Sequence, residues 1–237
     1  MTSRTEKPTP HIGTLNEKPL HAALKQYIAE EGDRFEIRVD RFVVDILRGS
    51  QIIEIQTGGT SALRRKLAAL LERYVVRLVI PLAARKDIVR VDAAGAVIGT
   101  RRSPRRLGVL DAFVELASLR EILADPNFSI EVVLIHEHEL RRPRAPRGRW
   151  QKGWEVGERR LVEVLDRISF DHPGDFLAAV PAALPEPFTT ADLAGAIGRP
   201  RRTAQAIAYC LREIGAIIAV DRTRQGIRYQ RNYGAST

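Results

Sequence analysis

Two carboxylates stand where their neighbours predict buried strands, and they are the residues of this chain best suited to chemistry. Asp45 and Glu54 each lie within a short apolar stretch, and an Arg-Gly-Ser turn at 48–50 separates the two stretches. Residues two apart in a strand share a face, so Glu54 is expected on the same face as Gln56. An ionised carboxylate on a core-facing surface is unfavourable unless it is paired or bound to a metal. The pair therefore predicts a site for a hard cation such as Mg²⁺ or Mn²⁺.

Composition favours a cytoplasmic protein with a polyanionic partner. The chain has 237 residues and a formal net charge of +9, with arginine in excess among its basic residues. This charge favours nucleic acid, although acidic protein partners or a biased genome would also explain it. Cys210 is the only cysteine, which excludes intrachain disulfides and thiolate zinc sites. No apolar run is long enough for a membrane span, and the N-terminus lacks the apolar stretch of a signal peptide.

The elements around the two acids follow a recognisable order. Residues 1–13 predict a flexible leader, and apolar residues at helical spacing from Pro19 predict a helix that ends at Gly32-Asp33. Three short strands follow over 34–56, then a helix over about 63–74. Residues 75–82 are nearly all apolar, which is typical of a strand buried on both faces. A strand, a helix and a second buried strand predict a crossover and a parallel pair.

Downstream of this core, alternation predicts a β-hairpin at about 86–100, a helix over 109–123 and a strand over 128–138. Residues 141–160 combine prolines, glycines and arginines with Trp150 and Trp154, and they predict a basic loop. Two interpretations of the loop stay open. It is either a solvated connection or an arm that stacks aromatic rings on bases and pairs arginines with phosphates.

The acids and this element order resemble the PD-(D/E)XK nuclease superfamily, whose restriction-endonuclease-like fold is an α/β core with a mixed sheet flanked by helices. Asp45 matches the family's metal-binding Asp, and Glu54-Ile55-Gln56 matches its (D/E)-X-K tripeptide with Gln in place of Lys. The resemblance implies a Mg²⁺-dependent phosphodiesterase over residues 14–165, with Asp45 and Glu54 as metal ligands. Gln56 would orient the attacking water, and Glu17 matches a further acid that the family often carries near its first helix. Lys66 or Arg65 on the following helix would supply the charge that Gln56 lacks.

Residues 171–237 predict a small winged-helix domain. Their order is a short helix, a helix capped at Thr189, a turn, a helix opened by Pro200, and a hairpin around 222–226. In helix-turn-helix proteins the second helix of the motif enters the major groove of DNA. The residues expected to contact nucleic acid, together with Arg65, are Arg199, Arg201, Arg202, Thr203, Gln205, Arg222, Arg224 and Arg228. A winged helix used for protein contact or dimerisation is the alternative.

Other potentially reactive residues suggest no second site. His136 and His138 would share a strand face and could chelate a metal, but the sequence indicates no third ligand, so ordinary polar residues are expected. Cys210 lies among helical apolar residues and predicts a small core residue. The spacing of His11, His21 and His172 suggests no catalysis. The sequence therefore predicts a DNA nuclease that could act as a homodimer and that has no membrane partner. A catalytically inactive DNA-binding protein of the same fold and an RNA-directed nuclease are the alternatives.

Overall fold

The computed structural model describes residues 18–144, 153–178 and 180–235 of the chain. A seven-stranded mixed sheet runs in the order β1-β2-β3-β4-β6-β7, with β5 paired to β4 outside this path. The strands are β1 (Arg34–Val39), β2 (Phe42–Arg48), β3 (Gln51–Ile55), β4 (Val75–Val91), β5 (Val97–Arg102), β6 (Phe128–Pro143) and β7 (Trp154–Phe170). β3 pairs in parallel with β4, and β4 with β6, whereas the remaining pairs are antiparallel. The predicted crossover and parallel pair are confirmed.

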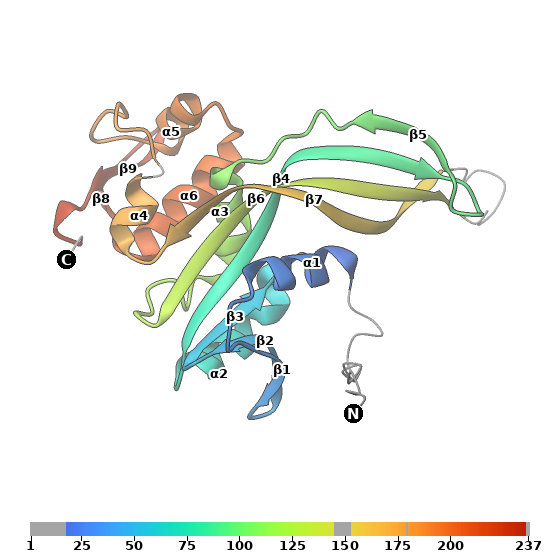
Figure 1. Cartoon of the computed structure of the whole chain (residues 1–237). Coiled ribbons are helices and arrows are strands. Elements are labelled where there is room, and N and C mark those ends of the chain that lie inside the picture. The colour runs from blue at the N-terminus through green and yellow to red at the C-terminus, as the bar shows by residue number, and fades with distance from the viewer. Residues whose placement is uncertain (1–17, 145–152, 179, 236–237) are drawn as a thin grey trace.

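Helices cover both faces of the sheet, as Figure 1 shows. One face packs on α1 (Pro19–Ile28) through Leu20 and Leu24. The other packs on α2 (Arg64–Leu71) and on α3 (Ala112–Leu116), which single turns of 3₁₀-helix flank at Val109–Asp111 and Ala117–Leu119. Neighbouring residues of the central strands alternate between the two cores, for example Leu78 and Val79 on β4. The class of fold is therefore a mixed α/β sheet flanked by helices. The predicted helix over 109–123 is shorter and divided.

The outer halves of β4, β6 and β7, together with β5, extend away from the helices as a long arm (Figure 1). The predicted hairpin at 86–100 is present as the end of β4 and β5. The basic loop predicted over 141–160 is wrong at both ends, because β6 continues to Pro143 and β7 begins at Trp154. Exposed charged residues occupy much of β7, so their pattern lacks the apolar alternation that predicts a strand. Trp150, residues 1–13 and Glu17 lie outside the described residues.

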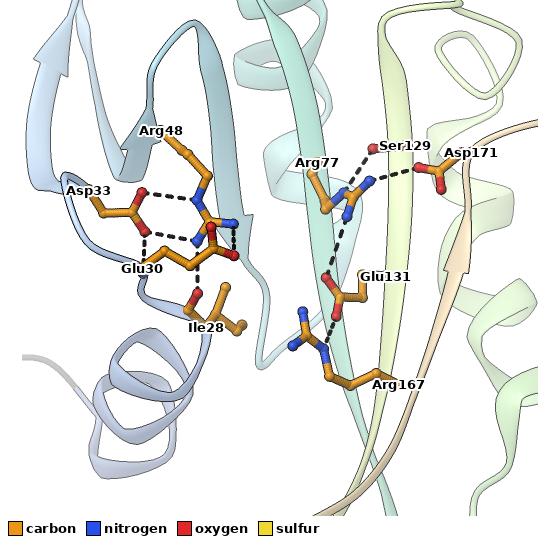
Figure 2. Close-up of polar contacts among 9 residues, drawn as sticks. All are labelled: Ile28, Glu30, Asp33, Arg48, Arg77, Ser129, Glu131, Arg167 and Asp171. Carbon is orange, nitrogen blue, oxygen red and sulfur yellow. Dashed lines mark hydrogen bonds and ion pairs between the residues drawn. The ribbon is translucent and has the colours of Figure 1, made fainter.

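Two networks of ion pairs connect neighbouring elements of the fold (Figure 2). Arg48 at the end of β2 donates two hydrogen bonds to Asp33, at 2.9 and 2.8 Å, and one to the Ile28 carbonyl oxygen at 2.8 Å. Glu131 on β6 is buried and pairs with Arg77 on β4 and Arg167 on β7. The second network thereby joins three strands through a single buried acid.

The C-terminal region forms the other end of the molecule (Figure 1). It contains α4 (Pro173–Ala178), α5 (Thr190–Ile197), α6 (Arg201–Glu213), a hairpin of β8 (Ile217–Thr223) with β9 (Gly226–Arg231), and a last 3₁₀ turn at Tyr233–Ala235. This is the predicted element order. Thr189 caps α5 as predicted, accepting from two backbone N–H groups of its first turn. Cys210 is buried on α6, and its core is continuous with that of the sheet. No helix in the described part of the chain is both long and apolar enough to cross a membrane.

Candidate active site

The two acids face each other where strands β2 and β3 separate. The antiparallel register pairs Ile46 with Ile53 and then ends, so the next opposed positions are Asp45 and Glu54. At that point the Asp45 carboxylate accepts the backbone N–H of Ile55 at 2.8 Å. A side-chain oxygen thus takes a position that a strand carbonyl would occupy in a continued ladder. The Asp45 side chain therefore links the two strands just beyond the end of their paired residues.

Lys66 reaches the acids from α2. Its Nζ donates to Glu54 Oε2 at 2.7 Å and to the Val43 carbonyl oxygen at 2.6 Å. Its charge also lowers the pKa of Asp45, so the ammonium group acts on both acids. The crossover places Lys66 there, because η2 (Thr60–Leu63) and α2 follow β3 directly and α2 packs on the sheet through Leu67 and Leu70. The lysine expected from the following helix is therefore beside the acids.

His21 is a site residue that the sequence analysis missed. Its Nε2 lies 3.2 Å from Asp45 Oδ2, and α1 presents it from the opposite face of the sheet to α2. Burial raises the pKa of Asp45, but the hydrogen bond and charge of His21 and the Ile55 N–H outweigh it and leave the pKa below 3.8. Asp45 is consequently ionised at neutral pH. The available signal was the position of His21 within the first predicted helix, four residues after the predicted site residue Glu17 in the sequence.

Glu54 is perturbed in the opposite direction. Burial, followed by the negative charge of Asp45, raises its pKa from 4.5 to about 7, against the lowering effect of Lys66. Only 3% of the residue is exposed, and its Oε1 has no hydrogen-bond partner among the residues described. A buried oxygen without a partner, facing a second carboxylate, is costly unless a cation completes the site. The donor set fits a hard divalent cation, which prefers oxygen ligands.

The other predicted site residues are placed less directly. Gln56 donates from Nε2 to the Gly59 carbonyl oxygen at 2.7 Å, so the loop after β3 engages its amide. Arg65 is exposed on α2, one residue before Lys66. The prediction for Glu17 falls outside the part of the chain that the structure describes.

The predicted nucleic-acid contacts divide into exposed and engaged side chains. Arg199 pairs with Asp111 at 3.0 Å, Arg228 pairs with Asp221, and Thr203 is buried. The exposed members are Arg201, Arg202, Gln205, Arg222 and Arg224. Beside them is a hollow of about 260 Å³ lined by Thr190, Arg201, Gln205, Tyr209, Arg212, Gly226, Ile227 and Tyr229. The exposed face of α6 and the adjoining hairpin thus form a basic, partly concave surface.

The fold and site define a mixed α/β protein with an opposed acid pair at a strand separation and a basic C-terminal region. The chain belongs to the family described as "Domain of unknown function (DUF8091)", whose sequence profile matches residues 18–171. That range contains all seven strands of the large sheet and both acids. The chain is also 30% identical over 185 residues to a Treponema pallidum (strain Nichols) protein named "Uncharacterized protein", covering 77% of this chain and 73% of the relative. No solved structure matches the chain.

Proposed function

We propose that the protein is a Mg²⁺-dependent nuclease of the restriction-endonuclease-like class that acts on DNA. The observation that carries the proposal is the opposition of Asp45 and Glu54 at the separation of β2 and β3, with Lys66 beside them. Asp45 and Glu54 would hold the cation. When bound, Mg²⁺ would position or acidify a water molecule and offset charge on the phosphate.

The chain's own residues have separable roles in this proposal. His21 keeps Asp45 ionised and oriented through the contact of its Nε2 with Oδ2. Lys66 supplies the positive charge that Gln56 lacks, and it would neutralise a phosphate oxygen next to Glu54. Gln56 would orient the attacking water from the end of β3, and Arg65 would contact the DNA backbone. Glu17 would serve as the family's further acid.

The C-terminal region would hold the substrate as a winged helix. Its support is the order of α5, α6 and the β8–β9 hairpin, and the exposed arginines on α6 and the hairpin. Arg201 and Arg202 stand at the start of α6, the end of a recognition helix that contacts bases and phosphates. Arg222 and Arg224 would reach the neighbouring backbone from the hairpin. The net charge of +9 agrees with such a substrate.

Cleavage of labelled single-stranded, duplex and branched DNA in Mg²⁺ or Mn²⁺ tests the proposal. We expect cleavage by the wild-type protein and loss of activity, by roughly a hundredfold or more, in the Asp45→Ala/Glu54→Ala variant. Glu72→Ala is the matched control, since it removes an exposed glutamate from the end of α2. Equal cleavage by the double variant would exclude this site. Labelled RNA at the same salt concentration distinguishes an RNA-directed enzyme.

Moving the lysine from position 66 to position 56 tests the role of its ammonium group. Lys66→Gln should lose most cleavage, and the added change Gln56→Lys should restore part of it by placing an ammonium group in the tripeptide. The Gln56→Lys single variant measures the effect of the new lysine alone. Full activity of Lys66→Gln would show that the ammonium group has no part in the reaction.

A non-catalytic DNA-binding protein is the second candidate. It is favoured by the present pairing of each acid, Asp45 with His21 and Glu54 with Lys66, and by the engagement of Gln56 with Gly59. Calorimetric titration with Mn²⁺ separates the candidates. Binding that disappears in Asp45→Ala supports the nuclease, whereas DNA binding without any Mn²⁺ binding at the acids supports the second candidate.

A further inference from the structure

A second cluster of potential metal ligands lies in the arm, away from the acid pair. The sequence indicated no third ligand for His136 and His138, and in the structure Asp87 on β4 lies beside them. Their ligand atoms all lie within 4.8 Å of one another. Asp87 follows Leu78, the β4 partner of Glu54, by nine residues, which is about 30 Å along a strand. The cluster is therefore separate from the site proposed for catalysis.

The sheet register assembles this cluster. His136 and His138 are two residues apart on β6 and share a face, while Asp87 is the parallel-strand partner of His138. His136 Nε2 lies 2.7 Å from Asp87 Oδ2, and His138 Nε2 lies 3.9 Å from the same oxygen. The His136 side chain is only 7% exposed and that of His138 is 40% exposed. The group is thus rigidly positioned on its inner side and accessible to solvent on its outer side.

We propose that Asp87, His136 and His138 bind one divalent transition-metal ion, with Zn²⁺ as the best-suited ion. Two imidazole nitrogens and one carboxylate oxygen are a ligand set for Zn²⁺ or a related ion, whereas Mg²⁺ and Ca²⁺ prefer oxygen alone. Ligands of a tetrahedral zinc are about 3.3 Å apart, given metal–ligand distances of about 2.0–2.1 Å. The two separations from Asp87 Oδ2, 2.7 and 3.9 Å, bracket that value, and the third separation is no more than 4.8 Å, so the three atoms are near enough to share one ion after side-chain rotation.

The setting indicates what such an ion would do and what would oppose it. Beside the cluster, the core of the arm consists of Val89, Val91 and Leu140, so a metal joining β4 to β6 would add stability where apolar burial is small. Arg102 on β5 competes for the carboxylate, since its Nε lies 3.9 Å from Asp87 Oδ1. Removing this guanidinium is therefore expected to tighten metal binding. A structural arginine next to an ordinary ion pair would give no such effect.

Metal titrations of the tag-free, chelator-treated full chain test the proposal. The Asp45→Ala/Glu54→Ala background removes the other candidate cation site, so failure here leaves the nuclease proposal unaffected. Zn²⁺ binding is measured by calorimetry, and Co²⁺ binding by its visible absorption, which reports nitrogen and oxygen coordination. We expect one equivalent of either ion. His138→Ala and Asp87→Asn should weaken binding by at least about tenfold, because changes to surrounding groups alone cost about 10–100-fold.

Two further variants complete the test. His172→Ala removes an exposed histidine elsewhere and should bind like its parent. Arg102→Ala should bind more tightly than its parent. The proposal is overturned if the parent binds no Zn²⁺ or Co²⁺, or if His138→Ala and Asp87→Asn bind as tightly as His172→Ala while retaining their circular dichroism spectra. Misfolding of Asp87→Asn would leave His138→Ala, at a solvent-facing position, to decide the result.

Discussion

Replacing Glu54 by Gln should make the metal-free protein more stable at alkaline pH. The substitution keeps the shape of the side chain and an oxygen that accepts from Lys66 Nζ, while it removes the buried charge. Burial, with the charge of Asp45 second, raises the Glu54 pKa from 4.5 to about 7 in the folded protein. The folded state consequently binds the Glu54 proton more tightly than the unfolded state does. The contribution of protonated Glu54 to the free energy of unfolding is therefore fully present below about pH 4.5 and is lost as the pH rises through 7.

The size of the effect follows from the two pKa values. One unit of pKa difference between folded and unfolded protein corresponds to about 1.36 kcal/mol. For a rise from 4.5 to about 7 the ionisation of Glu54 costs about 3 kcal/mol at about pH 8.5, but only about 1 kcal/mol at about pH 5. The free energy of unfolding of Glu54→Gln should exceed that of the wild type by these amounts. The difference between the two proteins should thus grow by about 2 kcal/mol over this range.

Urea unfolding in a chelator, followed by circular dichroism at several pH values, measures this difference. Glu72→Ala serves as the control, because it removes an exposed carboxylate at the end of α2. A pH-independent difference between Glu54→Gln and wild type would refute the argument, since Glu54 would then titrate as it does in the unfolded chain. Added Mg²⁺ should narrow the gap above pH 7 by stabilising the ionised wild type alone.

Three other sets of substitutions have definite expected outcomes. Asp45→Asn should lower the pKa of Glu54, because the Asp45 charge is the second cause of its rise, so the pH-dependent loss of stability should occur at a lower pH than in the wild type. Urea unfolding at several pH values measures this, and an unchanged midpoint pH of the loss would show that the two acids do not interact. Arg201→Ala/Arg202→Ala should make the plot of log DNA affinity against log salt concentration less steep, by about 0.9 for each arginine that pairs with a phosphate. Fluorescence anisotropy measures this slope, and the control Arg38→Ala on β1 should leave it unchanged. Arg77→Ala/Arg167→Ala should lower the free energy of unfolding in urea by about 3–5 kcal/mol, because the buried Glu131 would keep an uncompensated charge. Glu131→Ala should lower it less, and a larger loss of stability in Glu131→Ala would contradict this.

The sequence predicted the core of the fold because its signals are local. Apolar alternation and the glycine turn located β2 and β3, and the all-apolar run after α2 located the start of β4. It failed for β7 because this strand is largely exposed and charged, so pairing with β6 rather than local preference determines its structure. It also underestimated β4 and β6, whose outer halves contain polar residues that pair with charged neighbours in the arm.

The same distinction applies to the candidate sites. Asp45 and Glu54 were predictable because each is an acid within its own apolar strand, and this contrast is visible within five residues. The Asp87–His136 contact spans 49 positions and depends on the register of β4 with β6. No spacing rule within a single chain segment reveals it. A histidine pair on one strand was the available signal, and the third potential ligand comes from β4, the parallel neighbour of β6.

Lys66 shows how helix packing can bring a cation to an acid pair from a separate element of the fold. The side-chain amide of Gln56, two residues after Glu54, donates to the carbonyl oxygen of Gly59. Lys66 instead contacts Glu54 from α2, and it also holds the Val43 carbonyl oxygen where β2 leaves β3. The lysine therefore contacts both strands at the place where their ladder ends. The position of Lys66 depends on the packing of Leu67 and Leu70 against the sheet. Substitutions of these core residues should therefore change the contact between Lys66 and the acid pair, although neither residue is itself part of the pair.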